Sequence, residues 1–317
     1  MRGSNDEQRL LFGRRVSRRA LFRGAGVTGL GVVAAALIGC TDDDDDDNGG
    51  GVAAAGSLLE RVRERGYIRI GFANEAPYGF ANASGEVTGE APEVAKAVLA
   101  ALGVPEVDGV VTTFGSLIPG LQAGRFDMIA AGMFINPDRC QQILFSDPDY
   151  CVPTAFGVEA GNPLGLNTFD DIASSEDATV GVLSGAVEEG YALDSAVPDG
   201  RVVRFDEATS LAEGLAAGRV DAIALTSLSV RAQLDRLANA NLEMTEGFVP
   251  VIDGEDQVGC GGYGFRMEDQ AFRDAFNDVL VQMKENGRVL PIVEPFGFFQ
   301  DEVGAAEGRT AEDLCEA

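Results

Sequence analysis

The feature that most constrains the fold of this chain is a ten-residue pattern that occurs twice. Residues 121–130 read LQAGRFDMIA and residues 215–224 read LAAGRVDAIA, so both copies share L-x-A-G-R-x-D-x-I-A. Each copy closes a run of segments in the order strand, helix, strand, helix, strand, which predicts a parallel-rich sheet with crossover helices. We therefore expect an α/β protein with two similar lobes and a ligand cleft between them.

The order of the segments also gives the bounds of the two lobes. An extended apolar segment after Cys151 leads into the second unit, and a late strand is expected to return the chain to the first. We expect lobe 1 to comprise residues 57–153 plus 259–317, and lobe 2 to comprise residues 154–258. Two crossing strands would then join the lobes as a hinge.

The loops after the strands of the first unit carry most of the candidate functional residues. In parallel sheets, ligands bind beyond the carboxyl ends of the strands. These loops contain Glu75, Tyr78, Phe114, Phe134 and Arg139. An isolated phenylalanine is more often part of a core. Here, however, two phenylalanines share one rim with a tyrosine, a glutamate and an arginine, and this combination predicts a binding site.

Arg139 follows a strand and the dipeptide Asn136-Pro137, which is typical of a helix start with an N-cap and a proline at the first position. A cation in the first turn of a helix lies at the positive end of the helix dipole, so a nearby anion would stabilise it. The planar guanidinium is also the best bidentate partner for a carboxylate. The alternative interpretation is an exposed, solvated arginine.

Residues 1–40 predict a targeting segment. Paired arginines in residues 17–23 precede a Gly- and Ala-rich apolar stretch that resembles a twin-arginine signal, and the stretch ends in a lipobox-like LIGC whose Cys40 would be lipidated. An uncleaved anchor is the alternative, but the stretch is shorter than the roughly 20 residues of a spanning helix. Residues 41–56, with six aspartates and then glycines, predict a solvated tether. We expect an extracytoplasmic, lipid-anchored protein.

Composition excludes several other functions. Residues 1–40 hold seven arginines, Asp6 and Glu7, so the remaining chain has 17 basic and 49 acidic residues and a net charge of −32. Such a chain is unsuited to nucleic acid, since little basic surface could neutralise phosphates. The chain has no histidine, which removes the commonest general base and zinc ligand. We predict no cofactor and no metal site.

Four cysteines remain after Cys40. An even number outside the cytoplasm favours two disulfides, and four cysteines allow three pairings. Proximity along the chain favours Cys140–Cys151 and Cys260–Cys315. A metal site is the rival, but no two of these cysteines form a CxxC pair.

Several motifs together resemble the family 3 extracellular solute-binding proteins of ABC importers over roughly residues 57–300. They are Ile68-Arg-Ile-Gly-Phe72, Pro77-Tyr-Gly-Phe80, Thr88-Gly-Glu-Ala-Pro-Glu93, residues 117–127 and Phe145-Ser-Asp-Pro-Asp-Tyr150. Residues 74–78, residues 132–140 and the Cys140/Cys151 pair most closely resemble the ectoine- and hydroxyectoine-binding subgroup. The resemblance implies a two-lobed periplasmic-binding-protein-like fold of type II, a small zwitterionic ligand, ABC permease subunits as partners, a monomer and no enzymatic activity.

The resemblance also implies roles for individual residues. Arg139 matches the arginine that binds the ligand carboxylate, and Glu75 matches an acidic partner of the ligand cation. The aromatic positions match Tyr78, Phe114 and Phe134. In the second lobe, the turn that donates hydroxyl and N–H groups matches residues 184–187.

The match in that turn is imperfect. Many relatives have threonine where this chain has Gly185, Ala186 and Val187, so the side-chain hydroxyl of Ser184 and the backbone N–H groups remain as donors. The implied second-lobe contacts are therefore Ser184, Gly185 and Val187.

Thr226 is an informative departure from the family pattern. Amino-acid binders usually have an aspartate there, and burying an α-ammonium without a carboxylate is costly. A cation delocalised over a ring fits better, because aromatic faces and Glu75 can surround it. Ectoine has such a cation and a carboxylate. A polar amino acid is the alternative ligand, and a dehydratase on the same fold is a less favoured alternative, since no nucleophile–base pair is evident.

Overall fold

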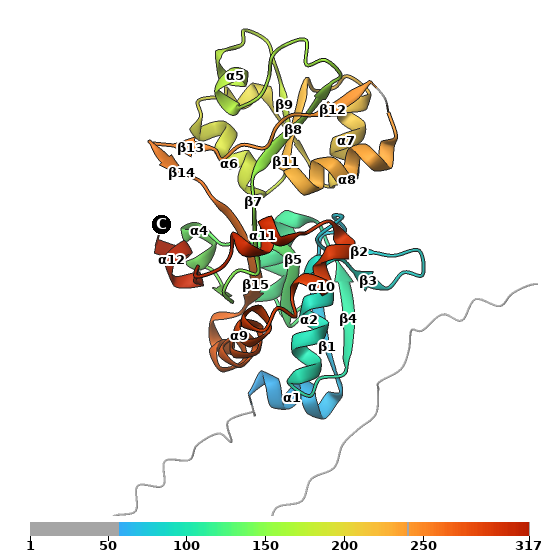
Figure 1. The fold of residues 1–317 in the computed structure, drawn as a ribbon, viewed down its shortest axis with the longest axis vertical. Coiled ribbons are helices and arrows are strands. Elements are labelled where there is room, and N and C mark those ends of the chain that lie inside the picture. Colours follow the sequence, from blue (N-terminus) through green and yellow to red (C-terminus); the bar gives the residue numbers. More distant parts are fainter. Residues whose placement is uncertain (1–56, 240, 317) are drawn as a thin grey trace, which may run out of the picture. The chain divides into compact units, whose positions relative to one another are not determined.

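A computed structural model describes residues 57–239 and 241–316. These residues fall within one compact unit, Ala54–Ala317 (Figure 1). The predicted export signal, Cys40 and the acidic tether lie outside the described residues. Among the helices that are described, none is long and apolar enough to cross a membrane.

The first sheet has the strand order β4-β1-β5-β15-β6, and β7 also pairs with β15. Strands β1 and β4 run parallel, as do β1 and β5, whereas β15 runs antiparallel to its neighbours. The bounds are β1 (Tyr67–Phe72), β4 (Glu106–Val111), β5 (Met128–Phe134), β6 (Leu144–Phe145), β7 (Tyr150–Val152) and β15 (Gly259–Phe265). We call this sheet and its helices lobe 1.

Lobe 1 has eight described helices, the second and third of which are the crossovers from β1 to β4 and from β4 to β5. They are α1 (Leu58–Arg65), α2 (Glu90–Ala101), α3 (Leu117–Gln122), α4 (Pro137–Cys140), α9 (Gln270–Glu285), α10 (Leu290–Val293), α11 (Gln300–Gly304) and α12 (Ala311–Glu316). A small hairpin, β2 (Phe80–Ala81) with β3 (Val87–Thr88), follows β1. Ser57 and Glu60 form a capping box at the start of α1, which explains where that helix begins.

The second sheet has the strand order β10-β9-β11-β8-β12. Strand β9 is parallel to β10 and β11, and β8 is antiparallel to β11 and β12. The strands are β8 (Thr154–Glu159), β9 (Val180–Leu183), β10 (Val202–Phe205), β11 (Ala222–Thr226) and β12 (Leu242–Met244), and the helices are α5 (Phe169–Ser174), α6 (Val187–Asp194), α7 (Ala208–Ala216) and α8 (Ser227–Leu237). We call this unit lobe 2, and it also carries the hairpin β13 (Val251–Ile252) with β14 (Glu255–Asp256).

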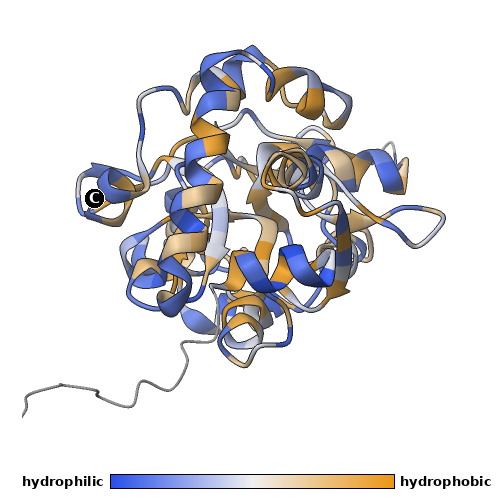
Figure 2. Ribbon diagram, turned by 90° about the horizontal axis from the view of Figure 1, so that it is seen from below, coloured by the Kyte–Doolittle hydropathy of each residue, from blue (hydrophilic) through white to orange (hydrophobic). Residues whose placement is uncertain are grey.

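Strands at the centre of both sheets are buried on both faces, which suits parallel sheets covered by helices. All seven residues of β15 and all five of β11 are buried. In Figure 2 the strands in the middle are mostly orange and white, whereas the helices around them carry both blue and orange residues. The expected α/β fold with two parallel-rich sheets is confirmed.

The repeated pattern occupies equivalent places, because one copy links α3 to β5 and the other links α7 to β11. Its glycines, Gly124 and Gly218, have φ values of 68° and 66° and end the two helices in the left-handed conformation. The aspartate of the first copy, Asp127, accepts a hydrogen bond from the N–H of Arg69 at 3.0 Å. Asp221 does the same for the N–H of Thr179 at 2.8 Å, so the pattern encodes one local structure twice.

The disulfides differ from the expectation. The structure pairs Cys151 with Cys260 and Cys140 with Cys315, so the pairing inferred from proximity is wrong. Strands β7 and β15 place Cys151 directly opposite Cys260, although 109 residues separate them. Helix α12 packs against α4, which brings Cys315 to Cys140. Strand pairing and the packing of α12 against α4 therefore decide which cysteines pair, and distance along the chain does not.

Candidate ligand-binding site

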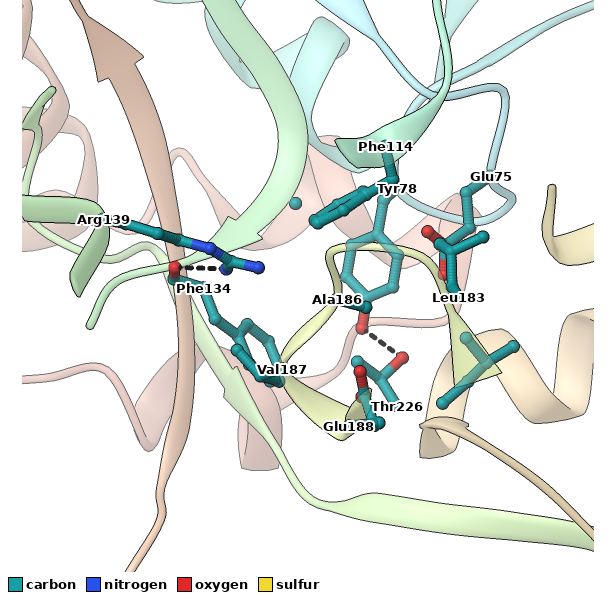
Figure 3. A pocket seen from close by; sticks show the side chains of 12 residues that line it. Glu75, Tyr78, Phe114, Phe134, Arg139, Leu183, Ala186, Val187, Glu188 and Thr226 are labelled. Carbon is teal, nitrogen blue, oxygen red and sulfur yellow. Dashed lines mark hydrogen bonds between the residues drawn. The ribbon is translucent and has the colours of Figure 1, made fainter. Parts of the chain in front are cut away.

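A pocket of about 330 Å³ lies between residues of the two lobes (Figure 3). All five residues expected on the rim of lobe 1 line this pocket, together with Gly132. From lobe 2 it is lined by Leu183, Ala186, Val187, Glu188, Leu225 and Thr226.

Arg139 is 7% exposed, which excludes the interpretation as a solvated surface arginine. Its helix begins as expected, since the Asn136 side chain accepts a hydrogen bond from the Arg139 N–H at 2.9 Å. The guanidinium donates to the carbonyl oxygen of Phe134 at 2.7 Å and, across to lobe 2, to that of Gly185 at 3.0 Å. It makes no ion pair with an Asp or Glu of the described residues. Burial lowers the pKa of Arg139 to about 10.

The aromatic residues surround the space beside Arg139, but they are held in different ways. Phe114 lies with its ring centre 5.4 Å from the guanidinium carbon of Arg139, so one of its faces already contacts a cation of the protein. The Phe134 ring lies over Gly259, where a Cβ atom would come within 2.1 Å of it. Only a glycine on β15 leaves room for that ring.

Tyr78 also depends on a glycine, because a Cβ atom on Gly132 would lie 2.2 Å from the Tyr78 ring. Its hydroxyl donates to the Thr226 hydroxyl oxygen at 2.8 Å. Thr226 in turn accepts from the N–H of Ser229 at 3.2 Å and caps α8. Tyr78 and Thr226 therefore form a bond between the lobes at the pocket wall.

Glu75 is buried behind this bond and accepts a hydrogen bond from the hydroxyl of Ser229 in lobe 2. Burial raises the pKa of Glu75 to about 7, and the hydrogen bond from Ser229 opposes that rise. A cation bound nearby would favour the ionised form of Glu75. The carboxyl group can thus change its charge with the occupant of the pocket.

The turn from residue 184 to residue 187 offers fewer donors than expected. Ser184 does not line the pocket, and its hydroxyl donates to Asp206 at 3.4 Å. The N–H groups of Ser184 and Ala186 are bonded to backbone carbonyl oxygens, and that of Gly185 is bonded to a Glu189 carboxylate oxygen. Val187 starts α6, whose first N–H groups have no partner within the helix. Val187 is therefore the N–H donor that this turn can offer, and Gly185 acts through its carbonyl oxygen.

Glu188 is a pocket residue that sequence reasoning missed. It lies beside Val187 in the first turn of α6, is 3% exposed and lines the pocket. Burial raises the pKa of Glu188 to about 7. Its neighbour Glu189 instead pairs with Arg204 at 2.6 Å. Two adjacent acidic residues at a helix start both suit the helix dipole, so no sequence signal separated the buried one from the paired one.

The charged groups are segregated within the pocket. In Figure 3 the Arg139 guanidinium lies on one side, and Glu75, Thr226 and Glu188 lie away from it, with aromatic rings of Phe114 and Phe134 near the guanidinium. Such a site can hold a small dipolar molecule with its anionic end at Arg139 and its cationic end at the carboxyl groups.

Comparison with known proteins gives the family. Residues 68–299 match the model of the bacterial extracellular solute-binding proteins, family 3. This chain belongs to that family. It is a solute-binding protein of an ABC importer, and such proteins work outside the cytoplasm.

Individual relatives of this family-3 protein differ in what they bind. A probable amino-acid ABC transporter periplasmic-binding protein from Sinorhizobium fredii is 35% identical and covers 81% of this chain and 85% of its own length. The crystal structure of EhuB in complex with hydroxyectoine is 40% identical, with a TM-score of 0.75, and covers 81% of this chain and 97% of that one. An ancestral amino-acid-binding protein, AncCDT-1, described as a precursor of cyclohexadienyl dehydratase, is 28% identical, has a TM-score of 0.66 and covers 76% and 99%.

Proposed function

We propose that this solute-binding protein captures a zwitterionic compatible solute with a ring-delocalised cation, namely ectoine or hydroxyectoine, and delivers it to its ABC permease. The observation that carries the proposal is the buried Arg139, whose partners are two carbonyl oxygens rather than a carboxylate. A buried cation without an anionic partner is costly. A ligand carboxylate would supply that partner.

The aromatic rings and carboxyl groups of the pocket also suit a delocalised cation. Phe134 and Tyr78 offer ring surface, and Glu75 can become the anionic partner. The likeness to EhuB, whose structure holds hydroxyectoine, supports the same ligand class for this chain. The roles that we propose for Glu75, Tyr78, Phe114, Phe134, Arg139, Val187 and Thr226 follow from this orientation.

A polar amino acid is the second candidate, and Glu188 is the observation that favours it. Thr226 disfavours an α-ammonium, because amino-acid binders of the family usually have an aspartate at that position. Glu188 brings a buried carboxyl group beside Thr226 in the same pocket (Figure 3). The relative from Sinorhizobium fredii, described as a probable amino-acid binder, fits this alternative.

Isothermal titration calorimetry separates the two candidates. The mature chain, meaning residues 40–317 without the predicted signal and carrying Cys40→Ser to prevent lipidation, is titrated with ectoine, hydroxyectoine, glycine betaine and a panel of amino acids. We expect the two ectoines to bind at least tenfold more tightly than any amino acid, a difference of about 1.4 kcal/mol. Tighter binding of an amino acid would reject the compatible-solute proposal and support the second candidate.

We also propose the route by which the protein reaches its place of action. Twin-arginine export, lipidation at Cys40 and a tether over residues 41–56 would hold a monomeric binding protein at the membrane. Fatty-acid labelling of cells should mark the natural chain and not Cys40→Ala. Replacing Arg18 and Arg19 with lysine should block export, and size-exclusion chromatography of the mature chain should give a monomer.

A further inference from the structure

Glu188 and Glu75 approach the same pocket from different lobes. Glu188 is 3% exposed and Glu75 is 6% exposed. Glu75 accepts a hydrogen bond from Ser229, whereas none of the described side chains donates a hydrogen bond to the carboxyl group of Glu188. In Figure 3 the Glu188 carboxyl group lies beside Thr226 and near the hydroxyl of Tyr78.

Four titratable or charged groups face Glu188: Glu75, Tyr78, Arg139 and Tyr191. Burial is the main cause of its raised pKa and the charge of Glu75 adds to the rise, whereas a hydrogen bond from its own backbone N–H and the charge of Arg139 oppose it. Burial also raises the pKa values of Tyr78 and Tyr191, so both are neutral phenols. With the pKa values of both carboxyl groups at about 7, the empty pair shares roughly one proton near neutral pH.

A count of charges decides what this pair does when the site is occupied. A zwitterion at Arg139 and Glu75 gives two positive and two negative charges, so these four charges balance. An ionised Glu188 would add a fifth charge without a partner, and an unpaired buried charge is strongly unfavourable. A neutral carboxyl group avoids this cost and can still donate one hydrogen bond.

We propose that Glu188 is a specificity-determining residue that keeps a proton in the complex, so that the Glu75–Glu188 pair presents one negative charge to a ligand with one positive charge. This inference rests on the proposed function, because it takes a zwitterion as the ligand. A ligand with two positive charges would instead ionise both carboxyl groups.

The proposal gives binding an unusual dependence on pH. Well below pH 7 the empty pair holds close to two protons and the complex holds one, so binding releases a proton and affinity falls as the pH falls. Well above pH 7 the empty pair is ionised and the complex still holds one proton, so binding takes up a proton and affinity falls as the pH rises. Affinity should therefore peak near pH 7 and fall by up to about tenfold per pH unit on either side.

The experiment measures ectoine binding by the mature Cys40→Ser chain, by the same chain with Glu188→Gln and by a control with Glu176→Gln. Glu176 is exposed in lobe 2 and does not line the pocket, so the control removes a carboxylate that the ligand does not meet. Titrations at about pH 5.5, 7 and 8.5, in buffers with different ionisation enthalpies, give both the dissociation constant and the number of protons exchanged.

We expect the natural chain and the Glu176 control to release a proton at the low pH and to take one up at the high pH. The Glu188→Gln chain should release a proton at the low pH, because Glu75 remains, but should take up none at the high pH. Its affinity should then level off above pH 7. The proposal would be overturned if the affinity of the natural chain also levelled off above pH 7.

Failure of the proposed function looks different, because ectoine would then bind to none of the chains at any pH. In that case the pH dependence of the stability of the ligand-free proteins shows whether Glu188 holds a proton in the pocket. A raised pKa means that Glu188 stabilises the fold most below about pH 4.5 and that this advantage is lost as the pH rises through about 7. A stability difference between the natural chain and Glu188→Gln that stays constant from pH 5 to 8.5 would overturn the proposal without any ligand.

Discussion

Replacing Arg139 with methionine tests the proposed site most directly. Methionine keeps an unbranched apolar stem and removes the guanidinium. The loss of a buried, charge-assisted contact to the ligand carboxylate should cost roughly 2–5 kcal/mol, which is roughly a 30- to 4,000-fold loss of affinity. Calorimetric titration with the ligand identified for the natural chain measures this loss.

The stability of the empty protein should change much less than the affinity. Burial lowers the pKa of Arg139 from its ordinary value to about 10, which corresponds to a cost of roughly 3 kcal/mol for holding the charge. Removing the guanidinium also removes two hydrogen bonds, to Phe134 and Gly185, each worth roughly 1.5–3 kcal/mol for a charged donor. The two effects largely offset each other, so the free energy of unfolding should fall by at most about 3 kcal/mol.

The matched control is Arg219→Met, since Arg219 is exposed and lies in the repeated pattern of lobe 2. Arg219→Met should match the natural chain in two measurements: the free energy of unfolding from urea denaturation of the empty protein, and the affinity from titration with ligand. If Arg139→Met binds as tightly as the control while its unfolding free energy drops by several kcal/mol, Arg139 serves only to join the lobes. The proposed orientation of the ligand would then be abandoned.

Three further changes test other parts of the site. Phe134→Leu should weaken ligand binding by up to about thirtyfold, through loss of a cation–π contact of about 2 kcal/mol, and a loss confined to thermal stability would show that the ring is only core. Ser229→Ala removes the donor that opposes the raised pKa of Glu75, so the pKa of Glu75 should rise further and the pH of tightest binding should move above 7; an unchanged pH profile would contradict this role. Glu90→Gln replaces a buried carboxyl group whose pKa is raised by burial and by Asp149. The natural chain should therefore be most stable relative to the variant below about pH 4.5, and this difference should decline as the pH rises. Urea denaturation at several pH values measures the difference.

Local sequence signals were enough to predict the fold and one wall of the site. The two repeated patterns each encode a helix end, a strand and an aspartate that binds a neighbouring strand, and all of these depend on residues close in sequence or in register. Arg139 was predictable for a similar reason, because the Asn136 cap fixes where its helix starts after β5. Parallel strands then place the loops that follow them on one rim.

Features that depend on packing between distant segments could not be predicted. Sheet register, and not sequence distance, sets the partner of Cys151. The burial of Glu188 depends on how α6 meets lobe 1, and the same helix turn leaves Glu189 at the surface with Arg204. Phe114 was expected to face the ligand cation, but its position beside Arg139 emerges only when α4 and the loop after β4 are placed together.

The contacts between the lobes leave donors for the ligand. Arg139 has five N–H donors, and two of them bond to the carbonyl oxygens of Phe134 and Gly185. Three donors remain for a carboxylate, so the ligand can bind Arg139 without breaking the bond to Gly185. Contacts with the ligand then add to the contacts between the lobes, and ligand in excess should stabilise the joined arrangement by RT ln(1 + [L]/Kd). Glu75 behaves in the same way, because Ser229 donates to one of its oxygens and the other stays available for a cation. Binding energy in this pocket is therefore available to hold the two lobes together, which is the form that a permease could distinguish from the empty protein.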